Sequence, residues 1–203
     1  MPSLTTAEIK QLLAPFLPNP EEILLEKLSL YLELLLKWNA RTNLTAIRTP
    51  EEIVTRHFGE SLFTATLLGT PKTLLDYGTG AGFPGLPIAL LRPDIAVTLG
   101  ESQNKKVSFL REAVRTLGLK TEIWAKRVED MPPTQRFDTV TLRAVDQMKP
   151  AILGAEPRAT RNLVVLTSYS GAQEIPLLEG FSQPVSTAMP QSEDRIVLQL
   201  TRL

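Results

Sequence analysis

The sequence predicts an α/β fold with a mainly parallel sheet, an antiparallel strand pair near the C-terminus and a helical extension at the N-terminus. From Thr73 onward, short apolar runs alternate with segments of helix length, which is typical of parallel strands covered by helices on both faces. Before Gly69 the apolar spacing is helical, and the run Gly69-Thr70-Pro71 then interrupts the pattern. We therefore expect a helical cap over residues 1–70 and an α/β domain over residues 71–203.

Three helical segments are expected in the N-terminal part. The strongest runs from Glu21 to Trp38, where apolar side chains recur at the helical spacing of about 3.6 residues. Another begins at Pro50, with Thr49 as its N-cap and Glu52 completing a capping box. The predicted segments are 4–14, 21–38 and, after a loop over 38–45, a helix from Pro50 to about Leu68.

The elements after residue 70 follow from the same kinds of pattern. Apolar runs of strand length are separated by stretches of helix length, and Gly118 marks a helix end. The last two apolar runs are expected to pair antiparallel and close the sheet. The candidate strands are 73–76, 95–99, 121–125, 137–142 and 162–167, the helices are 84–91, 104–117 and 146–153, and the closing pair is 184–189 and 194–200.

The composition excludes several classes of protein. With 43% hydrophobic and 22% charged residues, the chain is typical of globular domains rather than disordered segments. It has no apolar run of about 18 residues, and its N-terminus lacks the pattern of a signal peptide. Zero cysteines and one histidine exclude disulfides and argue against a metal site. We expect a cytoplasmic protein without a metal, whose net charge of +0 does not favour coating nucleic acid.

A glycine-rich loop follows the first predicted strand. The strand ends at Asp76, and the segment 78–85 contains the pattern G-x-G-x-x-G from Gly80 onward. Glycines allow sharp turns and close approach of a ligand to the backbone, and the following helix start offers free N–H groups. Glu101, at the end of the next strand, can bind two ribose hydroxyls. The pattern predicts a nucleotide-type cofactor, and its spacing also fits a nicotinamide dinucleotide.

Three details favour S-adenosylmethionine over a dinucleotide. A carboxylate at Asp76 would repel a pyrophosphate but suits the cationic amino group of a methionine moiety. Gly78 lengthens the loop to a pattern typical of methyltransferases, in which Gly80 also approaches the cofactor. The segment 128–131 follows the third strand, where an adenine pocket needs acceptors. The alternative for Asp76 is that it caps the next helix.

Further motifs follow one another in order between residues 20 and 170. They are Trp38-Asn39 with Asn43-Leu44-Thr45, Arg56-His57, Gly78-Thr79-Gly80-Ala81-Gly82-Phe83-Pro84-Gly85-Leu86-Pro87, Lys105-Lys106-Val107 with Phe109-Leu110, Arg127-Val128-Glu129 and Arg143-Ala144. The ordered set resembles the bacterial 16S ribosomal RNA guanine-N7 methyltransferase family, called RsmG or GidB (glucose-inhibited division protein B). The glycine-proline block is more specific than a generic glycine loop, and the ordered set is more specific still.

This resemblance implies a class I methyltransferase with a Rossmann-like fold. It implies S-adenosylmethionine as donor and N7 of a guanosine in 16S rRNA, free or in the small ribosomal subunit, as acceptor. We expect no membrane contact, no stable protein partner and a monomer. By motif position, the implied cofactor contacts are Gly78, Phe83, Val128, Glu129 and Arg143, with Glu101 on the ribose, and the functional positions are His57, Arg127 and Arg143.

Two positions depart from the family pattern. Glu101 stands where the family usually has Asp, but it keeps the carboxylate, so ribose binding should survive. Ser170, before Gly171, stands where relatives often carry Lys, which removes a cation from the expected RNA contact.

The functional positions also have structural interpretations. His57, with Arg56 and Glu60 on either side, fits a solvated helix face. Arg143 can stack on a base or bind phosphate, or it can form an ion pair with Glu129 or Asp146. Phe83 can pack into the core while its backbone N–H meets the cofactor carboxylate. Arg127 can bind phosphate or pair with Glu129.

Basic residues from several segments are expected to form a modest RNA-binding patch around the cofactor site. Three other functions remain open from the sequence: a small-molecule methyltransferase, a nicotinamide-dependent oxidoreductase and a non-enzymatic RNA-binding module. The expected patch residues are Arg41, Arg48, Arg56, Lys105, Lys106, Arg111, Arg115, Lys126 and Arg127.

Overall fold

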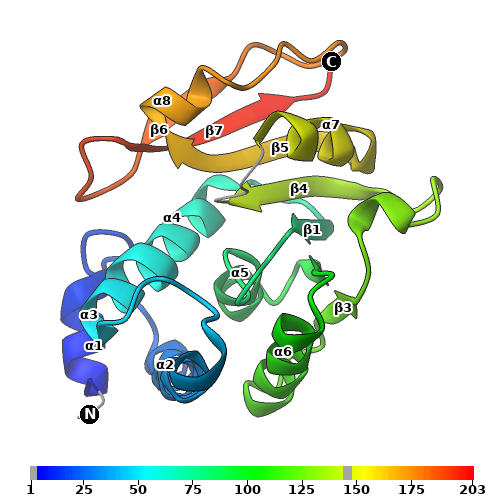
Figure 1. Ribbon diagram of the computed structural model, residues 1–203. Coiled ribbons are helices and arrows are strands. Elements are labelled where there is room, and N and C mark those ends of the chain that lie inside the picture. Colours follow the sequence, from blue (N-terminus) through cyan, green and yellow to red (C-terminus); the bar gives the residue numbers. More distant parts are fainter. Residues whose placement is uncertain (1–3, 144–147) are drawn as a thin grey trace.

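The computed structural model describes residues 4–143 and 148–203. It contains one seven-stranded sheet in the order β3-β2-β1-β4-β5-β7-β6 (Figure 1). Strands β1 to β5 pair in parallel, and β7 runs antiparallel to both β5 and β6. The strands are β1 (Thr73–Tyr77), β2 (Ala96–Gly100), β3 (Glu122–Trp124), β4 (Phe137–Arg143), β5 (Ala159–Ser168), β6 (Val185–Ala188) and β7 (Arg195–Thr201).

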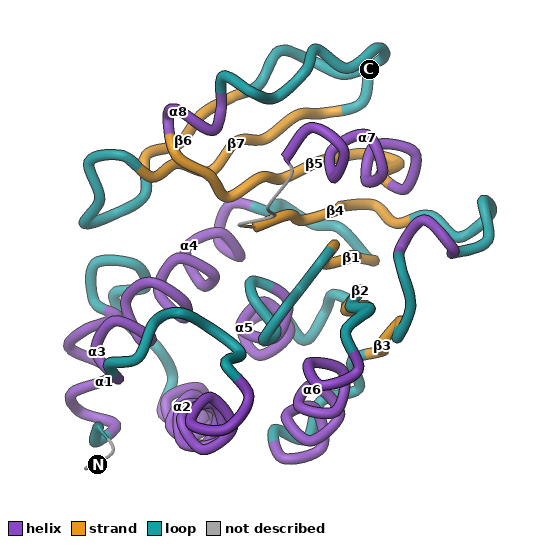
Figure 2. Tube along the Cα trace, viewed as in Figure 1, coloured by secondary structure: helices purple, strands orange, loops and turns teal. Residues whose placement is uncertain are grey.

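Helices cover both faces of this sheet (Figure 2). The N-terminal helices, α5 and α6 lie on one face, and α7 and α8 lie on the other. The fold class predicted from the sequence is confirmed. The α-helices are α1 (Thr6–Leu13), α2 (Glu22–Thr42), α3 (Pro50–Glu52), α4 (Glu60–Leu67), α5 (Gly85–Leu91), α6 (Asn104–Thr116), α7 (Met148–Ala155) and α8 (Tyr169–Ala172); a π-helix, η1 (Ile53–Gly59), joins α3 to α4, and the 3₁₀ turns are η2 (Val128–Asp130) and η3 (Glu156–Arg158).

The strand order reverses beside β1, and this reversal positions the site. Strand β1 lies between β2 and β4, so the connections after β1 and after β4 leave the sheet in different directions. In open α/β sheets, ligands bind at the carboxyl ends of the strands where such a reversal occurs. The loop after Tyr77, the end of β2 at Gly100 and the end of β4 at Arg143 therefore meet at one edge.

The N-terminal helices share a hydrophobic core with the sheet. Leu28 and Leu35 of α2 are fully buried in a cluster that includes Leu74 of β1, Leu99 of β2 and Val197 of β7. Successive strand residues point to opposite faces, so the neighbouring positions pack into a second cluster under α7. The packing joins residues on both sides of position 70, and the division into two domains stays a prediction.

Helix α2 is longer than predicted. It continues past Trp38 to Thr42 and ends where Asn43 adopts a left-handed conformation with φ of 49°. The Trp38 indole lies edge-on to Phe109, with ring centroids 5.8 Å apart, and its N–H donates to Glu112 at 3.0 Å. These contacts with α6 stabilise the last turns, so the predicted loop is wrong for residues 39–42.

The single helix predicted from Pro50 to Leu68 is divided by the π-helix η1. The predicted capping box at Thr49 is also wrong, because the Thr49 hydroxyl donates to Glu52 Oε2 at 3.1 Å and caps no backbone N–H. A complete capping box lies instead at Thr5 and Glu8.

The first two residues of the predicted helix 146–153 lie outside the described residues. Within residues 4–143 and 148–203, no helix has the length and apolar character that a membrane span requires.

Replacing Leu28 by Ala should destabilise the whole chain, because Leu28 is 0% exposed in the cluster that joins helices and sheet. We expect a loss of about 2–5 kcal/mol in the free energy of unfolding, measured by urea titration. Leu30→Ala is the matched control, since Leu30 on the same helix is 47% exposed and should cost less than about 1 kcal/mol. Equal losses from the two variants would contradict the described packing.

Candidate active site

The glycine loop takes a conformation that requires its glycines. Gly78, Gly80 and Gly82 have φ values of 68°, 60° and 95°, a region that residues with a side chain rarely adopt. At Gly82 a Cβ would also lie 2.6 Å from the Tyr31 hydroxyl. The loop therefore turns tightly over α2 and exposes its backbone at the carboxyl edge of the sheet.

Asp76 lies beneath this loop and is 0% exposed. Its carboxylate accepts hydrogen bonds from the Gly85 N–H at 2.7 Å, from the Thr141 hydroxyl at 3.0 Å and from the Thr79 hydroxyl. Burial raises the pKa of Asp76 to about 6. The carboxylate points at the start of α5 and accepts from its first N–H, as the alternative in which Asp76 caps that helix would require. The expected contact with the cofactor's amino group stays a prediction.

Glu101 directly follows β2 and lines the larger of two cavities at this edge. Its carboxylate accepts from the Gly80 N–H at 3.1 Å and the Gln103 N–H at 2.8 Å, so it also fixes the loop. The cavity has a volume of about 480 Å³. Several predicted cofactor residues line it together: Gly78, Glu101, Val128 and Glu129, with Tyr77 and Arg127 beside them.

Glu129 and Arg127 lie on the wall formed by the turn after β3. The Tyr77 hydroxyl donates to Glu129 Oε1 at 2.6 Å, which joins this turn to the end of β1. Among the described residues, Glu129 pairs with neither Arg127 nor Arg143. Arg127 lines the larger cavity, whereas His57 and Arg143 line a different one. The three predicted functional residues are therefore not in a single group.

A smaller cavity of about 180 Å³ adjoins the other side of the loop. Gly78 lines both cavities, so the two meet at the start of the loop. Phe83 forms one wall, but its N–H donates to the Thr79 carbonyl at 2.9 Å. The expected contact of that N–H with the cofactor carboxylate stays a prediction. The other lining residues include Thr45, His57, Gly80, Lys106 and Arg143.

His57 is held in this cavity by the π-helix η1. Its ring stacks on Phe83 with centroids 4.5 Å apart, and its Nε2 forms a 2.8 Å hydrogen bond with Thr45 Oγ1. Burial, with the nearby Arg143 and Arg56 guanidinium groups, lowers the pKa of His57 to about 2. The imidazole is therefore neutral, and His57 does not lie on the solvated helix face considered above.

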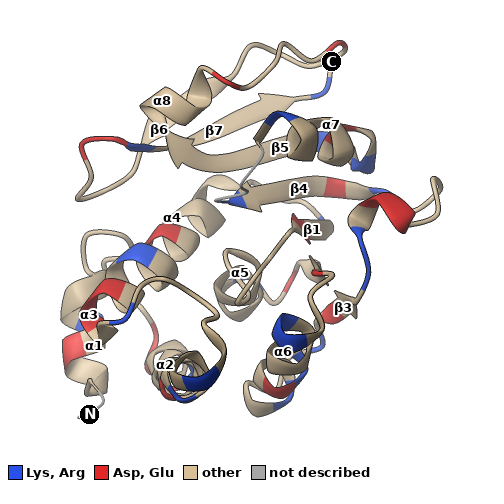
Figure 3. Ribbon diagram, viewed as in Figure 1, with Lys and Arg blue, Asp and Glu red and all other residues tan. Residues whose placement is uncertain are grey.

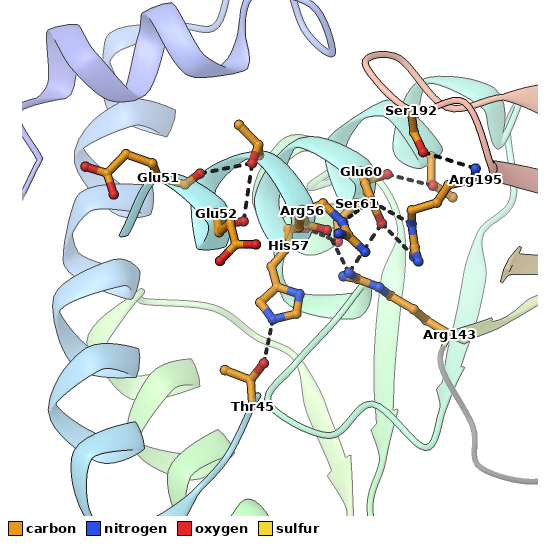
Figure 4. A network of polar contacts seen from close by, with 12 residues as sticks. Thr45, Glu51, Glu52, Arg56, His57, Glu60, Ser61, Arg143, Ser192 and Arg195 are labelled. Atoms are coloured by element: carbon orange, nitrogen blue, oxygen red, sulfur yellow. Dashed lines mark hydrogen bonds and ion pairs between the residues drawn. The ribbon is translucent and has the colours of Figure 1, made fainter. Parts of the chain in front are cut away.

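Glu60 is also buried, at 1% exposure, and its carboxylate forms ion pairs with three arginines (Figure 4). Its carboxylate lies 3.0 Å from Arg56, 3.3 Å from Arg143 and 2.7 Å from Arg195. No sequence pattern indicated this cluster, because Arg195 comes from β7 and a Glu four residues after an Arg usually marks a solvated face. Asp146, the other partner considered for Arg143, lies outside the described residues.

Tyr31 is a further site residue that the sequence did not reveal. Its spacing on α2 predicted only a packing position. The structure buries the ring against Phe58 and Phe83, and the hydroxyl donates to the Ala81 carbonyl at 2.5 Å. Helix α2 therefore holds the glycine loop directly.

Comparison with known proteins identifies the family. The family model described as rRNA small subunit methyltransferase G matches residues 24–178. This chain belongs to that family. Family membership confirms the resemblance found in the sequence, and it supports S-adenosylmethionine as the cofactor of this chain.

Relatives and solved structures agree with this assignment. The chain is 44% identical to the ribosomal RNA small subunit methyltransferase G of Chromobacterium violaceum over 72% of its own length and 70% of that protein. It is 47% identical to the protein of that name from Clostridium perfringens, over 61% of the chain and 54% of the relative, about half its length. A putative O-methyltransferase structure from Klebsiella pneumoniae has a TM-score of 0.64 at 16% identity, covering 97% of both chains. An O-methyltransferase from Bacillus cereus has a TM-score of 0.61 at 17% identity, over 96% of this chain and 97% of the other. These structural neighbours establish the shared fold.

The imidazole of His57 should not titrate between about pH 5 and pH 8 in the folded protein. The chain has one histidine, so the imidazole NMR signals can be assigned to His57 without ambiguity. Its folded pKa of about 2 lies below the unfolded value. Its contribution to stability is therefore present above about pH 6.5 and is lost progressively as the pH falls. The same signal should titrate near pH 6.5 in urea, and a similar midpoint in the folded protein would contradict the described burial.

Proposed function

We propose that this protein transfers a methyl group from S-adenosylmethionine to N7 of a guanosine in 16S rRNA. The observation that carries the proposal is a pair of cavities meeting at Gly78, in a chain that belongs to an rRNA methyltransferase family. One cavity suits a nucleoside and the other suits the reacting groups. The proposed setting is the cytoplasm, where the enzyme acts as a monomer on rRNA or the small subunit.

The larger cavity fits the adenosine part of the cofactor. Its lining includes the Glu101 carboxylate and the start of the glycine loop, where the glycines allow a ligand to approach the backbone closely. A Cβ on Gly100 would lie 2.6 Å from Val128, so the floor of the cavity depends on a glycine at that position. Glu101 would hold the ribose, and Val128 and Glu129 would flank the base.

The smaller cavity fits the methionine end and the target base. The bound cofactor supplies a methyl group made electrophilic by its cationic sulfur. Gly78 and Gly80 would line the path between the two cavities, and Phe83 and Arg143 would border the methionine end. Arg127, at the larger cavity, would contact RNA phosphate.

Methyl transfer to guanine N7 requires no general base. It has an in-plane lone pair and no proton, so it can attack the methyl group in line with the departing sulfur. His57 is neutral and its Nε2 is already bonded to Thr45, which agrees with a role in positioning the acceptor. Catalysis would then rest on alignment of the reacting atoms and on electrostatic support for the charge that moves to the base.

A tritiated-methyl transfer assay on deproteinised rRNA and on small subunits tests the proposed function. We expect label in 16S rRNA, and chemical cleavage specific for N7-methylguanosine should map it to one position. Label at another atom would overturn the choice of N7. Transfer only to small molecules, or none in the presence of S-adenosylmethionine, would overturn the choice of rRNA.

The single-turnover rate should be independent of pH between about pH 6 and pH 9, with RNA and cofactor saturating. The reason is that neither N7 nor the neutral His57 must lose a proton before transfer. A rate that falls about tenfold per unit below neutrality would show that a base is required. The unfolding midpoint should be measured over the same range, so that loss of folded protein is not mistaken for chemistry.

Reversing the charges of Lys105 and Lys106 should weaken rRNA methylation. Figure 3 shows basic residues on α2 and at the start of α6, and Lys106 lines the smaller cavity. The variant K105E/K106E should raise the KM for rRNA about tenfold or more at moderate salt. The control K72E/K120E changes two exposed lysines beside a different cavity, outside the proposed site. Equal effects from the two variants would contradict a localised RNA surface.

A further inference from the structure

Glu60 lies outside both cavities, yet its surroundings indicate a function. It is absent from the residues that line either cavity, and its carboxylate is almost inaccessible. A buried carboxylate is costly unless cations and hydrogen bonds compensate it. Here Arg56 comes from η1, Arg143 ends β4 and Arg195 begins β7. Three distant parts of the chain therefore converge on one side chain (Figure 4).

Of these three arginines, Arg143 is the one that lines the smaller cavity. Its Nη2 lies 3.3 Å from Glu60 and donates to the Arg56 carbonyl at 2.7 Å. Its other terminal nitrogen, Nη1, is buried and has no hydrogen-bond partner within residues 4–143 and 148–203. A buried donor without an acceptor is costly. The guanidinium is thus fixed through Nη2, whereas Nη1 has no acceptor among the described residues.

The charge around Nη1 favours an anion. Arg56, Arg143 and Arg195 surround one carboxylate, and Lys106 lines the same cavity. A guanidinium matches the planar geometry of a carboxylate. With the nucleoside beside Glu101, the methionine end would pass Gly78 into the smaller cavity, and its carboxylate is the anion available there.

We propose that Glu60 is a positioning residue: it fixes Arg143 so that the guanidinium, which lines the smaller cavity, binds the carboxylate at the methionine end of the cofactor. This inference rests on the cofactor of the proposed function and not on the RNA acceptor. Its test contains no RNA, so it succeeds or fails independently of the choice of guanine N7.

The test compares two ligands by isothermal titration calorimetry. S-adenosylhomocysteine carries the amino-acid end, whereas 5′-methylthioadenosine has the same nucleoside and lacks that end. In Glu60→Gln, the Kd for S-adenosylhomocysteine should rise about tenfold or more, because Arg143 loses its charged partner and its fixed orientation. The Kd for 5′-methylthioadenosine should stay within about twofold of the wild-type value, because the larger cavity is unchanged.

Glu51→Gln is the matched control, since Glu51 is exposed and precedes η1 in the same helical segment. It should bind both ligands like the wild type. If Glu60→Gln does not fold, Glu60→Asp takes its place: it keeps the charge, withdraws the carboxylate from Arg143 and should weaken S-adenosylhomocysteine selectively. Equal weakening of both ligands would show a structural role only and overturn the proposal. Unchanged or tighter binding of S-adenosylhomocysteine would also overturn it, because added positive charge alone would attract the carboxylate.

Discussion

The buried carboxylate of Asp76 is the contact on which the site depends. It joins the end of β1 to the hydroxyl of Thr141 on β4, to the loop through Thr79 and to the first N–H of α5 through Gly85. Each contact compensates for burying a polar group, and together they leave the carboxylate with no surface to offer a ligand. The loop above it can then present backbone, rather than charge, to the cofactor.

The site is completed by residues from the helical N-terminal part. Tyr31 holds the loop from α2, while Thr45 and His57 form one side of the smaller cavity. Glu60 orders the arginines behind that cavity. The π-helix η1 contributes to this arrangement because it carries Arg56 and His57 immediately before Glu60, and such irregular turns are frequent at functional sites. The helices that precede the sheet therefore form part of the site.

The features predictable from sequence were those with a local signal. The order of strands and helices, the glycine loop and the acidic end of β2 all follow from short patterns, and Glu101 lies where its pattern placed it. Contacts between distant residues had no such signal: Arg195 reaches Glu60, and Tyr31 reaches Ala81, through the fold alone. The role of Asp76 was ambiguous because a carboxylate at a strand end suits either a cation or a helix start. Its burial and its hydrogen bond from the Gly85 N–H favour the helix start.

A crystal structure of the complex with S-adenosylhomocysteine would test the role of Asp76 directly. We expect the nucleoside beside Glu101 and Val128, with the Asp76 carboxylate still accepting hydrogen bonds from Gly85 and Thr141. A structure in which Asp76 turns out to bind the amino group of the ligand, with its contact to Gly85 broken, would contradict this expectation.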